Sequence, residues 1–282
     1  FIGNVSFNVG SAYTNFIWSN NMVRFNTIAD FPVAQKLTLK ASHEAGKISL
    51  GNTKMPSTTF AISALHCNVG GKLINIKGST CNRCYAVKLQ KLRPSVNQGW
   101  TANLLKAVAM IDSNPNLWAK MVAFQIVRQS AKIGVNHHRW FDSGDLQSIA
   151  MLRAICLAAE LTPDHDHWLP TREAKIVKDY RKQYGVEPSN LCIRVSATMI
   201  DDAPIKGHEN TSTVHSKLNP HGKACEAYRT NIDGRVLSVD EHKTFKRLTK
   251  VQKKDSGIDL GHCGDCRDCW KKSVPNISYP LH

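Results

Sequence analysis

The sequence predicts an α/β fold with parallel strands, on the basis of two observations. Short apolar segments rich in β-branched residues alternate with amphipathic helical segments through the middle of the chain, a pattern typical of β/α units. Each of these predicted strands also runs directly into a polar cluster, as strands do where their carboxyl ends build a site. With 282 residues, of which 42% are hydrophobic, the chain can fill one large core.

The predicted strands are short runs with polar ends. The first, TTFAISAL (58–65), ends at His66 and Cys67. HHRWFDSGD (137–145) and DHDHWLPTRE (164–173) each predict a strand followed by a polar turn, and NLCIRVSATM (190–199) predicts a strand with a polar end. Because the carboxyl ends of parallel strands meet at one edge of a sheet, we expect these polar side chains to lie close together.

Four helices are predicted between these strands. They cover residues 100–112, 115–133, 146–161 and 173–185. Pro115 at the start of the second helix and Gly134 just past its end are suitable helix boundaries. Asp145 could cap the third helix.

Three cysteines form a first set, in which Cys67 is followed by the C-x2-C pair Cys81 and Cys84. The tight C-x2-C turn lets two thiolates reach one metal centre, and Cys67 arrives from the end of the first strand. Three thiolates suit a 4Fe–4S cluster with one iron left open. They also suit zinc completed by a fourth ligand, for which His66 is a candidate.

The segment GHCGDCRDCW gives a second set, with Cys263, Cys266 and Cys269 at C-x2-C-x2-C spacing. Ferredoxin-type clusters take three ligands from such a run and a fourth from elsewhere in the chain. Cys225 is the best fourth ligand, with His262 behind it. Four thiolates accept either zinc or an iron–sulfur cluster, so both remain open for this set.

The remaining residues indicate no other chemistry. Cys156 lies on the apolar face of a predicted helix and Cys192 within an apolar strand, so both are expected in the core. The sequence contains no Walker loop, GxGxxG motif, GxSxG elbow or HExxH motif. Nine cysteines in a chain of this length do not form a disulfide scaffold, and their clustering favours metal ligation in a reducing compartment.

The net charge of +15 is unevenly distributed. Residues 1–110 carry twelve Lys or Arg against two Asp or Glu, and KTFKRLTKVQKK (243–254) has six basic residues and no acidic one. Such patches can bind nucleic acid or another polyanion, or can simply form a solvated surface. No apolar run is long enough to predict a membrane span, and the first residues do not have the pattern of a secretory signal.

Six motifs occur in order along the chain. They are KMPSTTFAISALHC, KGSTCNRCYA, WFDSGDLQS, WLPTRE, RVSATMID and CGDCRDCW, the last followed by NISYPLH. Together they resemble the phage "gene product 88" domain family over about residues 50–282. We therefore expect a cytoplasmic protein, located in the host cytoplasm if a phage encodes it.

A strand followed by three cysteines ending in CxxCYA, and then β/α units, also resembles the radical S-adenosylmethionine (SAM) superfamily. The resemblance implies a partial parallel (β/α) barrel, a 4Fe–4S cluster on the first cysteine set, and SAM chelated by the open iron. It also implies cofactor-binding roles for Asp142, Ser143, Gly144, Asp145, Thr171, Arg172 and Ser196. The chain departs from that superfamily in its first cysteine gap, which is thirteen residues long, and in having Tyr85 after the last cysteine.

The expected organisation has three regions. Residues 1–50 form a poorly defined extension, residues 51–220 the β/α core with the first cysteine set, and residues 221–282 a four-cysteine segment packed on the core. The expected function is that of a radical-SAM-like iron–sulfur protein with one or two 4Fe–4S clusters, acting on an unknown substrate. The alternative is a zinc-stabilised phage protein that binds nucleic acid and has no catalytic activity.

Overall fold

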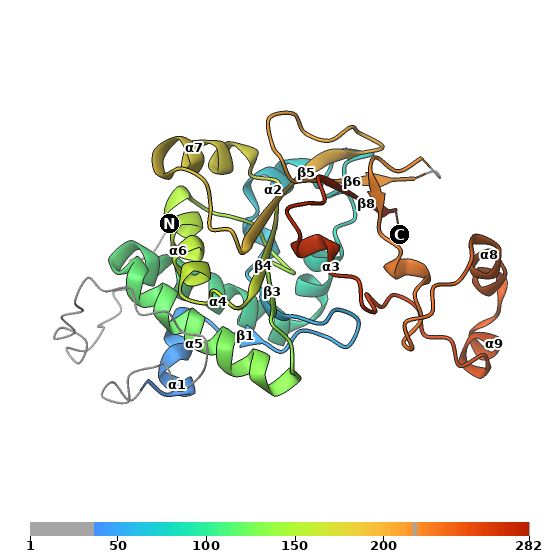
Figure 1. The fold of residues 1–282 in the computed structure, drawn as a ribbon, viewed down its shortest axis with the longest axis horizontal. Coiled ribbons are helices and arrows are strands. Elements are labelled where there is room, and N and C mark those ends of the chain that lie inside the picture. Colours follow the sequence, from blue (N-terminus) through green and yellow to red (C-terminus); the bar gives the residue numbers. More distant parts are fainter. Residues whose placement is uncertain (1–36, 217–218, 282) are drawn as a thin grey trace.

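The computed structural model describes residues 37–216 and 219–281, and an eight-stranded sheet forms its centre (Figure 1). The order is β1-β2-β3-β4-β5-β6-β8-β7, and only the β1–β2 pair is antiparallel. The strands are β1 (Ile48–Ser49), β2 (Thr58–Phe60), β3 (His137–Trp140), β4 (Asp166–Thr171), β5 (Leu191–Ile200), β6 (Thr211–His215), β7 (Lys223–Ala224) and β8 (Asn276–Pro280). Of the predicted N-terminal extension, residues 1–36 lie outside the described part.

The α/β class and the mostly parallel sheet are confirmed. Strands β2 to β6 lie side by side in chain order, the arrangement that β/α units produce when each strand is added next to the last. Among the described residues the sheet is open, because β1 and β7 stand at its two ends. The predicted barrel is therefore not confirmed.

One face of the sheet is covered by the long helices (Figure 1). These are α4 (Pro94–Ser113), α5 (Pro115–Ile133), α6 (Ile149–Glu160) and α7 (Ala174–Tyr184). Trp118 of α5 packs edge-on against Phe60, with ring centroids 6.0 Å apart, and lies the same distance from Trp140. All three are buried, so the core lies between the helices and β2–β3. Cys156 and Cys192 are fully buried as predicted.

The helix boundaries follow local capping chemistry. Helix α5 spans the predicted residues, since the Asn114 side chain accepts from the Leu117 amide and Gly134 adopts a left-handed φ of 64°. The prediction that Asp145 caps the next helix is wrong. Ser148 is the cap of α6, and its hydroxyl accepts from the amide of Met151.

The first strand is shorter than predicted, because β2 ends at Phe60. The amide of Ile62 donates to the carbonyl of Ser143, in the turn after β3, and a 3₁₀ helix follows at Ala64–His66. The chain thus leaves the sheet before it reaches Cys67. A short helix, α2 (Asn68–Leu73), and then α3 (Tyr85–Leu92) come next.

The opposite face of the sheet is covered by C-terminal residues. Trp270 packs edge-on against Trp168 of β4, with ring centroids 5.4 Å apart, and its indole donates to the carbonyl of His138. Helices α8 (Val239–Arg247) and α9 (Lys250–Asp255) stand away from the sheet at one end of the molecule (Figure 1). Within the described residues, no helix combines the length and apolar character that crossing a bilayer requires.

Candidate functional site

The first cysteine set lies at the carboxyl edge of the parallel sheet. Cys67 follows the 3₁₀ helix after β2 and is the N-cap residue of α2, and Cys84 is the N-cap residue of α3. The loop that leads into Cys81 is fixed to the end of β5, because the amide of Thr80 donates to the carbonyl of Thr198 over 2.9 Å. Two separate chain segments, the one that ends at Cys67 and the C-x2-C turn, therefore bring the three thiols to one edge.

The three thiols are close enough to influence one another. Burial, followed by the neighbouring Asp145, Cys84 and Cys81, raises the pKa of Cys67 to about 12. Burial also raises the pKa of Cys81, whereas the charge of Arg172 lowers it. Because thiolates are the metal-binding form, a bound cation would have to supply the positive charge that holds these groups ionised.

Local backbone geometry leaves room between the sulfurs. Arg83, inside the C-x2-C turn, has a φ of 65°, which is uncommon for a residue other than glycine. Gly70 has no side chain, and a Cβ there would lie 3.1 Å from the Cβ of Cys67 and 3.4 Å from the Sγ of Cys81. The absence of that atom keeps the space between two candidate ligands open.

The Asp142–Asp145 turn is pressed against the end of β2. Phe141, the residue before this turn, has a φ of 53°, which is an outlier for a bulky residue. Gly144, within the turn, has a φ of 85°. A Cβ on Gly144 would lie 2.3 Å from the Cγ1 of Ile62. Gly144 therefore has a packing reason to be glycine, and its predicted role in cofactor binding stays a prediction.

Asp145 joins the ends of two strands. Its carboxylate accepts from the amide of Leu146, from the Thr171 hydroxyl at 2.6 Å and from the amide of Arg172 at 2.9 Å. Burial raises the pKa of Asp145 to about 6, while these hydrogen bonds lower it. The contacts give Asp145 and Thr171 a structural task that fixes the turn after β3 to the end of β4.

Two polar atoms of the same turn lack partners. The Oδ1 of Asp142 and the Oγ of Ser143 are buried and form no hydrogen bond with a described residue. Burial raises the pKa of Asp142, and Arg139 and Thr59 lower it. Since buried polar atoms are nearly always paired, this turn has unused capacity for a polar ligand.

Of the two remaining predicted cofactor-binding residues, Arg172 lies beside the first cysteine set and Ser196 is engaged elsewhere in the sheet. Arg172 donates from Nε to the hydroxyl of Thr80 over 3.0 Å, so it connects the end of β4 with the cysteine loop. Ser196 lies instead in the pairing of β5 with β6, where its hydroxyl is 2.9 Å from that of Ser212.

Three residues of this site had no role assigned to them from the sequence. Gly70 provides the space just described. Glu173 accepts from the amide of Val69 over 2.9 Å and so holds α2 in place. Tyr85 donates its hydroxyl to the carbonyl of Asp142 over 2.6 Å. The only available signal was position, since Gly70 and Tyr85 lie beside cysteines and Glu173 follows the predicted strand end.

The second cysteine set lies on the other side of the sheet from the long helices. Burial, together with the thiols of Cys263 and Cys266, raises the pKa of Cys225 to about 11. Burial raises the pKa of Cys269 to about 12, and Cys225 and Cys266 again act in the same direction. Cys225, the predicted fourth ligand, is thus close to the C-x2-C-x2-C run.

A buried arginine braces this second set. Arg194 of β5 is fully buried, and its guanidinium donates only to backbone carbonyl groups. The acceptors are the carbonyl oxygens of Cys269 at 2.9 Å, Asp268 at 2.8 Å, Lys271 at 2.8 Å, Val274 at 2.9 Å and Thr211 at 3.4 Å. One side chain therefore shapes the loop that carries Cys269.

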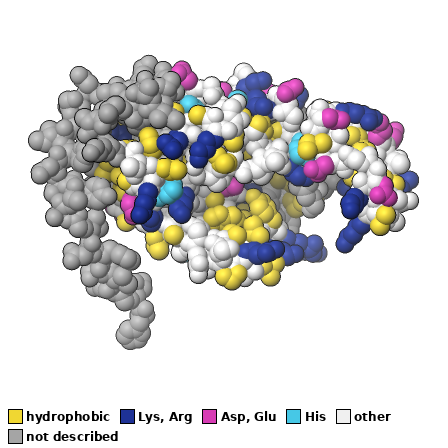
Figure 2. Space-filling model, turned by 90° about the horizontal axis from the view of Figure 1, so that it is seen from below, with side chains coloured by type: hydrophobic (Ala, Val, Ile, Leu, Met, Phe, Trp, Pro, Cys, Tyr) yellow, Lys and Arg dark blue, Asp and Glu magenta, His cyan; other side chains and the backbone are white. Residues whose placement is uncertain are grey.

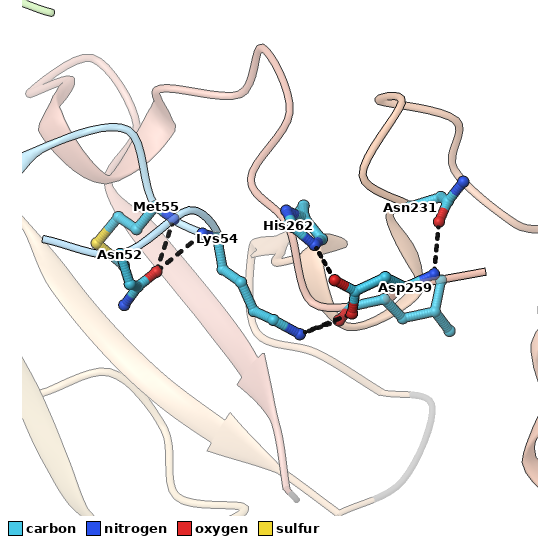
Figure 3. A network of polar contacts seen from close by, with 7 residues as sticks. Asn52, Lys54, Met55, Asn231, Asp259 and His262 are labelled. Carbon is cyan, nitrogen blue, oxygen red and sulfur yellow. Dashed lines mark hydrogen bonds and ion pairs between the residues drawn. The ribbon is translucent and has the colours of Figure 1, made fainter. Parts of the chain in front are cut away.

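A second brace reaches the loop from residues before β2 (Figure 3). The ammonium group of Lys54 lies 3.1 Å from Oδ1 of Asp259, and the other oxygen of that carboxylate lies 3.1 Å from Nε2 of His262. The amide of Cys263 donates to the carbonyl of Lys54 over 2.8 Å. His262 already has a partner in Asp259, just as His66, the histidine of the first set, lies 2.9 Å from Ser63.

The arrangement of the thiols bears on which metal group each set could hold. Among residues 37–216 and 219–281, no three or more His, Cys, Asp or Glu side chains are grouped so as to hold one metal ion. In a 4Fe–4S cluster each thiolate binds a different iron, so the sulfurs surround a volume and do not converge on one point. At the first set, the space beside Gly70, next to Cys67 and Cys81, suits that requirement.

Comparison with known protein families gives one assignment. The model of the family described as "Gene product 88" matches residues 33–272. The chain belongs to the gene product 88 family. The matched residues include all seven cysteines of the two sets. Searches among curated proteins and among solved structures gave no significant match.

Proposed function

We propose that this gene product 88 protein is a radical-SAM-like iron–sulfur protein that acts on a substrate through its first cysteine set. The observation that supports this most is the meeting of Cys67, Cys81 and Cys84 with the turns after β3 and β4 at the carboxyl edge of the sheet. Binding sites of parallel β/α folds form at that edge.

The topology supports the same proposal. Strands β2 to β6 follow one another in chain order with parallel pairing, as in β/α barrels, whereas doubly wound sheets reverse their order at a switch point. An open sheet of this kind is what a partial barrel would have.

The residues of the first set would divide the binding task. Three thiolates would hold a 4Fe–4S cluster and leave one iron for the amino and carboxylate groups of SAM. Asp142 and Ser143 offer unpaired oxygens to an amine, and Arg172 offers positive charge beside Cys67 and Cys81. When bound and reduced by an external donor, the cluster would supply the single electron that cleaves the sulfonium of SAM.

The second set would have a supporting role. Its four thiols would complete a ligand set and leave no position for a substrate. We assign to it a structural zinc or a second 4Fe–4S cluster, held by the loop that Arg194 shapes.

Metal analysis tests the proposal. The protein is purified without oxygen, and iron, sulfide and zinc are measured together with the visible spectrum. About eight irons per chain are expected for two clusters, or about four with one zinc. Zinc alone at both sets would exclude the radical-SAM function.

A cysteine variant then identifies the reactive set. Cys84→Ala should lose about four irons and abolish dithionite-dependent conversion of SAM to 5′-deoxyadenosine and methionine, measured by chromatography. Cys156→Ala, which changes a buried cysteine outside both sets, is the matched control and should keep the iron. SAM cleavage that survives in Cys84→Ala would refute the assignment.

The alternative is a zinc-stabilised nucleic-acid-binding protein without catalysis. The uneven positive charge of the chain favours it. Zinc at both sets, together with salt-dependent binding of nucleic acid and no SAM cleavage, would support this alternative.

A further inference from the structure

The chain around the first cysteine set is uniformly basic. Residues 67–93, which we call the basic rim, contain six Lys or Arg and no Asp or Glu. All six are exposed, and none forms an ion pair with a described residue. They are Lys72, Lys77, Arg83, Lys88, Lys91 and Arg93. A group of cations without neutralising partners attracts polyanions.

The basic rim also presents a fixed aromatic ring. Tyr85, the first residue of α3, directly follows Cys84 and is 64% exposed, although its hydroxyl is bonded to the carbonyl of Asp142. Leu89 and Leu92 follow four and seven positions later, which places them on the same helix face, and both are exposed. Because its hydroxyl bond already fixes the Tyr85 ring, the ring loses little conformational freedom when a flat group stacks on it.

We infer that the basic rim binds single-stranded nucleic acid, with a base stacked on Tyr85 and phosphates neutralised by the Lys and Arg residues around it. Repeated cations interleaved with an exposed aromatic residue are the combination that single strands require. A duplex is a poorer fit because its bases are stacked on one another and do not expose their faces. An acidic protein is a poorer fit because it has no base to stack on Tyr85. This inference deepens the proposed function, on which it rests for the reaction, by naming nucleic acid as the substrate class.

A second basic surface serves as an internal control. Helices α8 and α9, together called the basic arm, carry six Lys or Arg between positions 243 and 254 and form one end of the molecule (Figures 1 and 2). Lys243 pairs with Asp240 over 3.1 Å, and the ring of Phe245 is covered by the ammonium group of Lys253, 5.5 Å from its centroid. The basic arm thus has as many Lys and Arg residues as the basic rim, but its Phe245 ring is covered by Lys253.

Charge reversal on the two surfaces tests the inference. Binding of a labelled single-stranded oligonucleotide of about 20 nucleotides, longer than one site, is measured by fluorescence anisotropy at several salt concentrations. Reversing Lys88, Lys91 and Arg93 to Glu should weaken binding about tenfold or more and reduce the salt slope by about 2, since each phosphate contact contributes about 0.7. Reversing Lys243, Lys246 and Arg247 to Glu should change the affinity less than about twofold.

Substitution of the ring tests the stacking. Tyr85→Ala should weaken binding about fivefold to 150-fold, the range that corresponds to about 1–3 kcal/mol per stacked base. Tyr85→Phe keeps the ring and should bind within about threefold of the natural protein. Tyr184→Ala removes another exposed tyrosine, at the end of α7, and should have no effect. Unfolding midpoints of all variants establish that each is folded.

Three results would overturn the inference. These are no binding at low salt, a loss of affinity on reversal of the arm but not of the rim, and competition by polyglutamate as strong as that by unlabelled oligonucleotide. Iron is measured in the same preparations. A protein that lacks iron but binds the oligonucleotide through the basic rim would disprove the proposed function and support this interface. A protein that holds iron but does not bind the oligonucleotide would disprove the interface and leave the proposed function unaffected.

Discussion

The two cysteine sets use the same ligand chemistry in differently built surroundings. The first has three thiols at the carboxyl edge of the sheet, and Tyr85, next to Cys84, is bonded to the turn in which Asp142 and Ser143 have unpaired oxygens. The second has four thiols, and its loop is tied down by Arg194 and by Lys54. An incomplete ligand set beside unused polar groups suits a reactive centre, and a complete set with backbone bracing suits a structural one. This contrast is the reason why the proposed function assigns the reaction to the first set.

The largest expected effect comes from removing the brace of the second set. Arg194→Met keeps much of the side-chain volume but leaves five carbonyl groups of buried or half-buried segments without their donor. We expect the free energy of unfolding to fall by about 3–5 kcal/mol and metal to be lost from the second set. Urea denaturation and metal analysis measure both.

Arg172→Met is the matched substitution at the first set. Arg172 is only half-buried, and its guanidinium makes one hydrogen bond to a described side chain, that of Thr80, so the loss of stability should be about 1 kcal/mol. SAM binding should nevertheless weaken. Equal losses of stability in the two variants would contradict the contrast between a braced and an open set.

Acid should weaken the core to which the second set is attached. Burial lowers the pKa of His138 well below its usual range and that of His167 to about 3, so both are neutral in the folded protein. In the unfolded chain they take up protons below about pH 6.5. Their contribution to stability is therefore complete above that pH and is lost as the pH falls from about 6.5 toward 3.

The size of the acid effect follows from this linkage. His167 should cost about 2 kcal/mol between pH 7 and 5, His138 should add to this loss, and urea denaturation across that range measures the sum. In His167→Gln, the free energy of unfolding should depend less on pH, because the contribution of His167 is removed. An unchanged slope in that variant would show that other groups dominate. Metal release from the second set is best compared with the first above about pH 6, where the core is intact.

The sequence was sufficient for the parts of the fold that depend on local signals. The boundaries of α5 followed from Pro115 and Gly134, and the β/α alternation predicted β3, β4 and β5. Strands β6 and β8 were missed because TSTVH and NISYP lack hydrophobic alternation. Their pairing includes polar contacts such as Thr211 to Asn276 and Thr213 to Ser278. Such contacts join residues more than sixty positions apart, and no local pattern reveals them.

The candidate site shows the same division. The cysteine spacing and the polar residues after each strand could both be predicted from the sequence. The task of Asp145, in contrast, depends on Thr171 and on the amide of Arg172, which only the parallel pairing of strands brings near. Arg194 resembled any residue in the middle of a strand until its carbonyl partners, about 75 positions away, were known.

An effect smaller than that of Arg194→Met is expected at the turn after β3. Gly144→Ala forces a side chain into a left-handed backbone position and within 2.3 Å of Ile62, so the free energy of unfolding should fall by about 2–4 kcal/mol. Gly134→Ala is the control, because Gly134 has a φ of 64° with no neighbour within 4 Å and should cost only about 1 kcal/mol. Denaturation curves that coincide for the two variants would show that contact with Ile62 is unimportant.

The smallest effect on stability should be the most informative about the first set. Gly70 and Gly71 are neighbours in α2, and alanine favours a helix over glycine by about 0.5–1 kcal/mol. Gly71→Ala should therefore not destabilise the protein, and in Gly70→Ala the same gain should offset the tight contact with Cys67. The Cβ of Gly70→Ala would meet Cys67 and Cys81, whereas that of Gly71→Ala would meet nothing within 4 Å. Gly70→Ala should therefore lower the iron content of the first set, while Gly71→Ala leaves it unchanged. If both variants kept full iron, the space beside Gly70 would not be part of the cluster site, and the first set would have to hold its metal in another arrangement.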